Sequence, residues 1–276
     1  MDGFYDSHVH SCRSHDSEQT LKEICWAARA RGLRGVSITD HADLWFLEKD
    51  DTFLQIATST AEAKAADQEQ NGGLRVFCGV ELSEAMDDPE NTARILALAD
   101  YDVVLGSVHS IRFEEWNDSY SRICFDETVP EEKVARFLAV YFEQVLNLSA
   151  LGDFDILAHL TCPLRYICGK YRRRISLKPY AEMIDAIFSS LIRREMAVEV
   201  NTSGLHGMFC HLMPSEDLLR RYYAMGGRLI SLGSDAHVPT RLGNAFSEVV
   251  PLLQEIGFTG YYHYERRRPV FHNFRI

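Results

Sequence analysis

The sequence predicts an α/β protein in which parallel strands close into a barrel. Short β-rich runs alternate about seven times with longer amphipathic helical patterns over 276 residues, and a histidine or carboxylate follows nearly every run. Alternating strands and helices favour a parallel sheet. An open doubly wound sheet would also fit, but its strand ends spread along a line, whereas those of a barrel converge on one mouth. We therefore expect one domain spanning residues 1–276, with its functional site at that mouth.

The predicted strands are short runs of β-branched and aromatic residues that end where polar residues begin. The first leads into a histidine pair, the second into Thr39 and Asp40, and the third into Gly79. The fourth and fifth end at Ser107 and Ala158. In order, the seven strands cover residues 4–8, 34–39, 75–79, 103–107, 154–158, 197–200 and 229–232.

The predicted helices are bounded by capping and turn residues. Ser17 precedes the first helix and Gly32 ends it, Pro130 lies at a plausible first turn of the fourth, and Gly257 ends the last. Apolar side chains at helical spacing support the fourth most clearly. In order, the helices cover residues 20–31, 53–70, 90–99, 130–151, 177–195, 215–225 and 246–256.

Composition restricts the class of protein. Hydrophobic residues make up 46% and charged residues 25%, which is ordinary for a soluble globular chain. A net charge of −11 argues against a nucleic-acid-binding surface. We find no apolar run of about 18 residues and no signal peptide, so we expect no membrane span. Seven cysteines, an odd number without a C-x-x-C motif, indicate reduced thiols and a cytoplasmic location.

Six of the eleven histidines lie where a strand pattern ends. One such histidine is usually a hydrogen-bonded structural residue, but repetition at five strand ends indicates a shell of metal ligands. Imidazole suits Zn, Fe and Mn, and carboxylates favour Mn, Fe and Mg, so the metal stays open. A mixed set with open positions fits a hydrolytic site. The shell comprises His8, His10, His41, His109, His159 and His237, with Glu81 and Asp235 as carboxylates.

In this order, the motifs resemble those of the PHP (polymerase and histidinol phosphatase) superfamily, from about residue 4 to about residue 257. Residues 106–111 and 198–205 are most similar to its histidinol-phosphate phosphatase branch. The resemblance implies a distorted (β/α)7 TIM-like barrel, with three divalent metal ions at the C-terminal ends of the strands. Asp6 and Asp40, next to predicted ligands, are interpreted as groups that orient ligand imidazoles, although a capping or turn role is equally compatible with the sequence.

Transferred residue by residue, the resemblance implies a complete ligand set. One ion would be held by His8, His10, Glu81 and Asp235, and a second by Glu81, His109 and His159. The third would be held by Asp16, His41 and His237. His15 could compete with Asp16, but the six-residue spacing from His10 favours Asp16. Glu81, Asp235 and His237 would be the catalytic residues, and a full set makes a non-catalytic structural PHP module the weaker alternative.

The implied activity is phosphomonoester hydrolysis, with L-histidinol phosphate of histidine biosynthesis as the expected substrate. A water bridging two ions would become the attacking hydroxide. Arg165, just after His159, is the first candidate for binding phosphate; Lys170 and the basic run at 172–174 are weaker. His206 stands where the resemblance leads us to expect a second arginine. The substrate could therefore be another small phosphate, a nucleotide or phosphotyrosine. The sequence leaves the metal, the general acid and the oligomeric state open.

Overall fold

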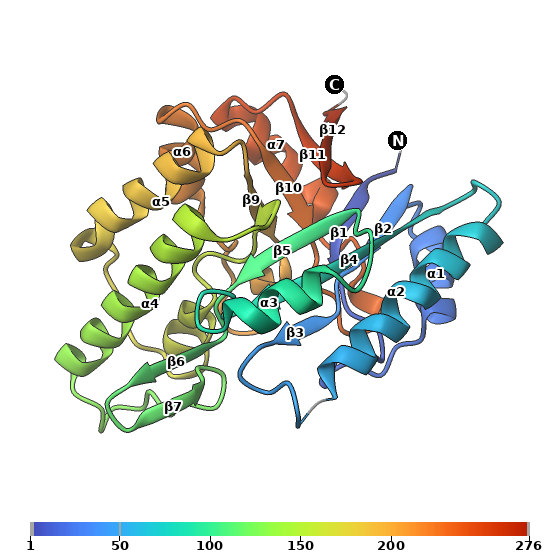
Figure 1. Cartoon of the computed structure of the whole chain (residues 1–276). Helices are drawn as coiled ribbons and strands as arrows, with labels where there is room; N and C mark the ends of the chain where they lie inside the picture. The colour runs from blue at the N-terminus through green and yellow to red at the C-terminus, as the bar shows by residue number, and fades with distance from the viewer. Residues whose placement is uncertain (1–2, 50, 275–276) are drawn as a thin grey trace.

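A parallel sheet curls into a nearly closed barrel surrounded by helices in the computed structural model, which describes residues 3–49 and 51–274 (Figure 1). The strands are paired in the order β1, β2, β4, β5, β8, β9 and β10, with β3 beside β4. Their bounds are β1 Tyr5–Val9, β2 Gly35–Ile38, β3 His41–Asp43, β4 Arg75–Ser83, β5 Val103–Ser107, β8 Ile156–Leu157, β9 Ala197–Asn201 and β10 Ile230–Gly233. This arrangement confirms the predicted distorted (β/α)7 barrel.

The barrel closes where β1 meets the segment that follows β10. The Asp235 amide donates to the His8 carbonyl at 2.9 Å, and the His10 amide donates to the Ala236 carbonyl at 3.0 Å. Closure therefore lies between residues that the sequence predicts for one metal site.

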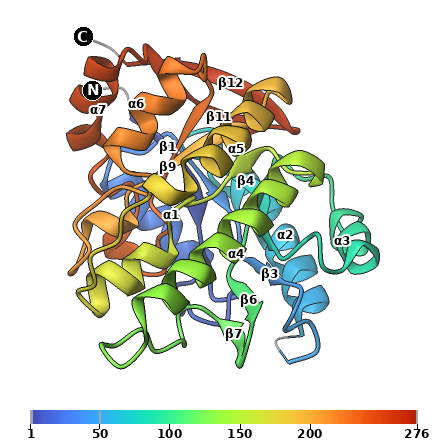
Figure 2. The ribbon, with the colours of Figure 1, turned by 90° about the vertical axis from the view of Figure 1, so that its left-hand side faces the viewer.

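All seven predicted helices are present, on the outside of the barrel (Figures 1 and 2). The first begins at a capping box of Thr20 and Glu23, whereas Ser17 donates to the carbonyls of His10 and His237. The helices are α1 Leu21–Ala30, α2 Thr52–Glu69, α3 Pro89–Leu96, α4 Glu131–Leu151, α5 Ala181–Arg193, α6 Glu216–Ala224 and α7 Phe246–Ile256. Short turns are η1 Arg165–Lys170, η2 Lys178–Tyr180, η3 Ser203–Leu205 and η4 Pro239–Arg241.

Two hairpins were not predicted, and they lie at opposite ends of the barrel (Figures 1 and 2). β6 (Ser110–Phe113) and β7 (Trp116–Ser119) lie by the mouth. β11 (Gly260–Glu265) and β12 (Arg268–Asn273) cover the other end, where Tyr5 stacks on His263 and His272 at centroid distances of 4.1 and 4.5 Å. β7 and β12 are exposed or only partly buried, so they lack the apolar run by which the buried barrel strands were predicted.

Helix α4 qualifies the expectation that the chain has no membrane span. By length and composition alone it is long and apolar enough to cross a bilayer. However, its apolar side chains, including Phe137, Tyr141 and Phe142, are buried in the protein core. A buried helix of a globular protein has the same composition, so α4 is weak evidence for a membrane.

Candidate metal centre

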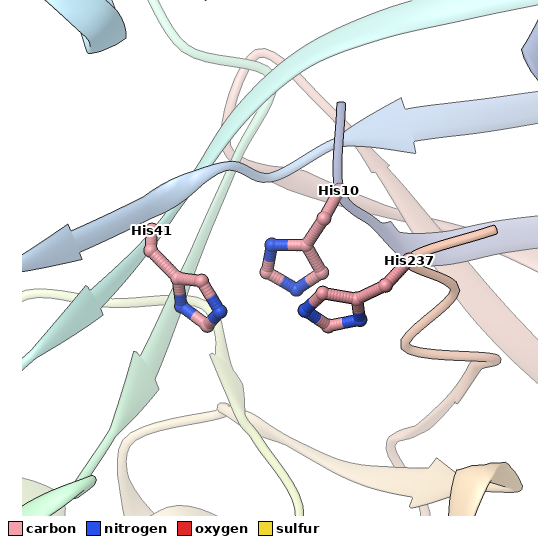
Figure 3. Close-up of side chains that lie close together, drawn as sticks. All are labelled: His10, His41 and His237. Carbon is pink, nitrogen blue, oxygen red and sulfur yellow. The ribbon is translucent and has the colours of Figure 1, made fainter. Parts of the chain in front are cut away.

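The barrel brings the side chains of all nine predicted ligands to its C-terminal mouth. His8 lies in β1, His41 opens β3, and the other histidines of the set follow the ends of their strands. Strand β4 runs on to Ser83, so Glu81 lies within a strand instead of after one. Figure 3 shows three of the imidazoles facing one another; the ring of His10 is 4.2 Å from those of both His41 and His237.

The fully buried carboxylate of Glu81 is the centre of the cluster. Its Oε1 lies 2.7 Å from Nε2 of His159 and 3.2 Å from Nε2 of His109. Its Oε2 faces the imidazole nitrogens of His41 at 2.9 Å, His8 at 3.4 Å and His10 at 3.5 Å. A carboxylate with imidazole nitrogens on both oxygens can therefore offer an oxygen to a cation on either side.

Several buried atoms in the cluster make no hydrogen bond of acceptable angle with any described residue: His41 Nδ1, Glu81 Oε2 and His237 Nε2, although the first two lie only 2.9 Å apart. An unsatisfied buried polar atom costs about 1–3 kcal/mol. Four trios of donors lie within 4.8 Å of one another: His8, His10 and Asp235; His8, Glu81 and His159; His41, Glu81 and His109; and His10, His41 and His237. Divalent cations would satisfy the orphaned atoms, so these residues fit a metal centre.

Asp16, not His15, faces the expected partners. Its carboxylate lies 3.5 Å from His41 Nε2 and 3.2 Å from His237 Nε2. Nδ1 of His15 instead lies 4.0 Å from Asp43. The spacing argument that favours Asp16 agrees with this geometry.

Charge within the cluster keeps the carboxylates ionised. Burial opposes ionisation of Glu81, but the charges of His109, His8 and His41 outweigh it and hold the pKa of Glu81 well below its usual value. Burial, followed by the charges of His237 and His41, lowers the pKa of His10 well below its usual value. His10 is therefore neutral, the form of imidazole that binds metal.

Asp40 is linked to the imidazole of His10 through the hydroxyl of Ser14, whereas Asp6 contacts no imidazole among the described residues. Ser14 Oγ donates to Asp40 at 2.7 Å and lies 3.0 Å from Nδ1 of His10, so Nδ1–H donates to Ser14 and Nε2 is left free. Asp6 accepts from the Ser234 amide at 3.0 Å and the Gly243 amide at 2.8 Å. Asp6 also accepts from the amide of His8 at 3.3 Å. These contacts fit the turn role that the sequence left open for Asp6 beside the orientation of an imidazole ring.

Sequence reasoning missed two further carboxylates that contact the imidazole rings of predicted ligands. Asp43 lies 3.0 Å from Nδ1 of His109, and Glu199 lies 2.7 Å from Nδ1 of His8. A signal was available for Glu199, because a charged residue between Val198 and Val200 in a buried strand is unusual. Asp43 carried a weaker signal, its position two residues after His41 on a strand.

A pocket at the mouth gives access to the cluster. Its lining adds aromatic rings and two arginines to the histidines and carboxylates of the cluster: Phe46, Tyr120, Arg122, Arg165 and Tyr166. Arg165 donates to Ser203 Oγ at 3.2 Å and lies 3.9 Å from Asp235. Arg122 was missed because it follows the unpredicted hairpin β6–β7.

The other two predicted substrate residues are placed less favourably. Within the described chain, neither His206 nor Lys170 belongs to the lining of this pocket. Nε2 of His206 contacts the side-chain amide of Asn244, and burial, then the charge of Arg241, lowers the pKa of His206. Lys170 Nζ lies over the ring of Tyr171 at 5.0 Å. The lowered pKa opposes the expected protonated form of His206, and substrate binding by either residue stays a prediction.

Comparison with known proteins identifies the family. A model of the PHP domain matches residues 6–203. The chain belongs to the PHP domain family. PHP relatives include the probable histidinol-phosphatase of Clostridium acetobutylicum, 27% identical over 91% of this chain and 92% of that protein. Another is the histidinol-phosphatase of Lactococcus lactis subsp. lactis, 26% identical over 92% and 91%.

A solved structure supports the PHP fold. The histidinol phosphate phosphatase of Lactococcus lactis, complexed with zinc, L-histidinol and phosphate, superposes with a TM-score of 0.77. The match covers 97% of this chain and 98% of that one at 23% identity. It therefore shows the same barrel over the whole length.

Proposed function

We propose that this protein is a metal-dependent phosphomonoesterase that hydrolyses L-histidinol phosphate to L-histidinol and phosphate. The observation that carries the proposal is the Glu81 carboxylate, which lies within 3.5 Å of five imidazole nitrogens at the mouth of a PHP barrel. Relatives named histidinol-phosphatase that match over about nine-tenths of this chain support the substrate.

The nine donors suit three divalent ions. His8, His10, Glu81 and Asp235 would hold one, Glu81, His109 and His159 the second, and Asp16, His41 and His237 the third. Bound there, the ions would supply Lewis acidity toward phosphoryl oxygens and lower the pKa of a coordinated water. The identity of the metal, Zn, Mn or Fe, does not follow from the donor set.

The chain's own residues would position the substrate. Arg165, whose side chain is 39% exposed at the mouth, offers a planar cation suited to phosphoryl oxygens. The rings of Phe46 and Tyr166 form an apolar wall for the leaving group. The buried carboxylates and imidazoles are held in fixed positions in a low-dielectric site. Charge that develops on the substrate during the reaction is therefore stabilised without a cost for reorienting the surrounding groups.

A second candidate is hydrolysis of another small phosphate ester. Among the described pocket residues, the only carboxylates are Asp16, Asp43 and Asp235, which all contact histidines of the cluster. An ammonium-bearing substrate therefore finds no free carboxylate there, whereas Arg122, which also pairs with Asp118 at 3.2 Å, adds positive charge to the pocket. A relative named only as a probable phosphatase, from Photobacterium profundum, is 25% identical over 94% of this chain.

The test is phosphate release from a panel containing histidinol phosphate, phosphotyrosine, a nucleoside monophosphate and p-nitrophenyl phosphate. We expect kcat/KM for histidinol phosphate to exceed the others by at least about a hundredfold, since polar recognition of a substrate gives discrimination of this order or more. A Glu81→Gln preparation controls for contaminating phosphatases. If another ester is turned over faster, the second candidate replaces the first. The cytoplasmic location and the absence of nucleic-acid binding stay predictions.

A further inference from the structure

We infer that Glu199 is a positioning residue that aligns two ligand-bearing segments of the metal centre, and that Gly233 leaves the space its carboxylate needs. This inference rests on the proposed metal centre. It concerns residues that touch neither the substrate nor, in the proposed ligand sets, the ions.

Glu199 connects segments that are far apart in the chain. It lies in β9 with its side chain 1% exposed. Oε1 lies 2.7 Å from Nδ1 of His8 in β1, and Oε2 accepts the backbone N–H of His159 at 2.7 Å. Asn201 donates a third hydrogen bond to Oε2 at 3.1 Å. One carboxylate therefore fixes His8 and His159 relative to each other.

The contact with His8 determines which ring nitrogen faces the cluster. A carboxylate oxygen accepts, so the hydrogen bond is donated by Nδ1–H of His8. Nε2 is then the nitrogen available to a cation, and it points to His10 Nε2 at 3.0 Å and Glu81 Oε2 at 3.4 Å. Fixing the tautomer in this way prepares His8 to bind a cation.

The contact with His159 holds an unusual backbone conformation. His159 has φ of +24°, in a region that side chains other than glycine rarely adopt. Such a conformation persists only where surrounding contacts impose it. The short bond from its amide to Glu199 is one such contact, and it places His159 Nε2 2.7 Å from Glu81.

At position 233 only glycine leaves room for the neighbouring side chains of Glu199 and His8. It is the last residue of β10 and pairs with Asn201 of β9. A Cβ at this position would lie 1.9 Å from Oε1 of Glu199 and 2.9 Å from Cβ of His8. Because such contacts are too close for any side chain, even alanine must displace the Glu199 carboxylate or the His8 side chain.

Two variants disturb this arrangement in different ways. In Glu199→Gln, one of the two oxygens is replaced by an NH2 group that cannot accept, so the variant loses either the bond from His8 at Oε1 or the bond from the His159 amide at Oε2. Gly233→Ala keeps the carboxylate but moves it. Asp155→Asn is the matched control, since this buried carboxylate accepts from the Val104 amide at 2.8 Å and from Arg267 at 2.5 Å, beside the hairpin β11–β12.

The experiment measures Zn²⁺ affinity of full-length protein by competition with a chelator, together with the melting temperature of the metal-free form. We expect Glu199→Gln and Gly233→Ala to weaken Zn²⁺ binding about 10–100-fold, whereas Asp155→Asn melts at a lower temperature but binds Zn²⁺ like the wild type. If Gly233→Ala does not fold, Glu199→Gln decides alone.

Two results would overturn the inference while leaving the proposed function intact. One is wild-type Zn²⁺ affinity in a folded Glu199→Gln variant. The other is an equal loss of affinity in Asp155→Asn, which would indicate general destabilisation. If the wild type itself bound no Zn²⁺, Mn²⁺ or Fe²⁺, the proposed function would fail and the inference with it.

Discussion

Replacing Glu81 with glutamine removes the charge on which the metal centre depends while keeping the shape of the side chain. Both oxygens of Glu81 face imidazole nitrogens, at 2.7 Å for His159 and 2.9 Å for His41. At an effective dielectric of about 20, one unit charge acting on another at about 4 Å is worth about 4 kcal/mol. Losing it should reduce metal affinity and kcat/KM by about a thousandfold or more, since about 1.4 kcal/mol corresponds to a factor of ten.

The assay is steady-state phosphate release by metal-loaded protein, accompanied by metal analysis and a melting curve. We expect Glu81→Gln to fold, because glutamine fills the same volume without a buried charge. Glu265→Gln is the control: its carboxylate also contacts an imidazole, that of His263 at 3.0 Å, but in the hairpin at the opposite end of the barrel. A Glu81→Gln variant with a full metal complement and near-wild-type turnover would refute the bridging role.

Further predictions concern the pocket, the third ion and pH. Arg165→Ala should raise KM about 10–100-fold, because a hydrogen bond between charged groups is worth about 1.5–3 kcal/mol; an unchanged KM would remove Arg165 from the phosphate site. Asp16→Asn should lower metal content measured by elemental analysis, whereas His15→Asn should not, and the reverse order would exchange their roles. Chelation should abolish phosphate release and added metal should restore it; activity that survives complete metal removal would contradict the mechanism. Burial, then the charge of His263, lowers the pKa of His272 to about 4, so its contribution to stability is present above about pH 6.5 and is lost as pH falls toward 4. Urea midpoints should fall across this range, and should fall less in His272→Gln.

The barrel and the nine donors could be predicted because both follow from local patterns. Eight of the donors lie at or just beyond a run of strand-forming residues, and a parallel barrel must gather such ends at one mouth. Asp16 follows no strand and was assigned through the resemblance to the PHP family, which places a ligand six residues after His10. In these cases the sequence neighbourhood of each residue carries the information.

The supporting residues could not be predicted, because their partners are distant in the chain. Glu199 is 191 residues from His8, and Asp43 is 66 residues from His109. His206 was expected to assist a cation site, yet its ring contacts Asn244, which no local pattern indicated. Hydrogen-bond partners of this kind become visible only when the fold places the strands side by side.

Anomalous diffraction from crystals of the metal-loaded protein tests the central claim most directly. The account predicts three peaks at the barrel mouth, two of them on opposite oxygens of Glu81 and the third beside Asp16, His41 and His237. Peaks elsewhere on the molecule, or the absence of any peak contacting Glu81 in crystals grown with saturating metal, would contradict it.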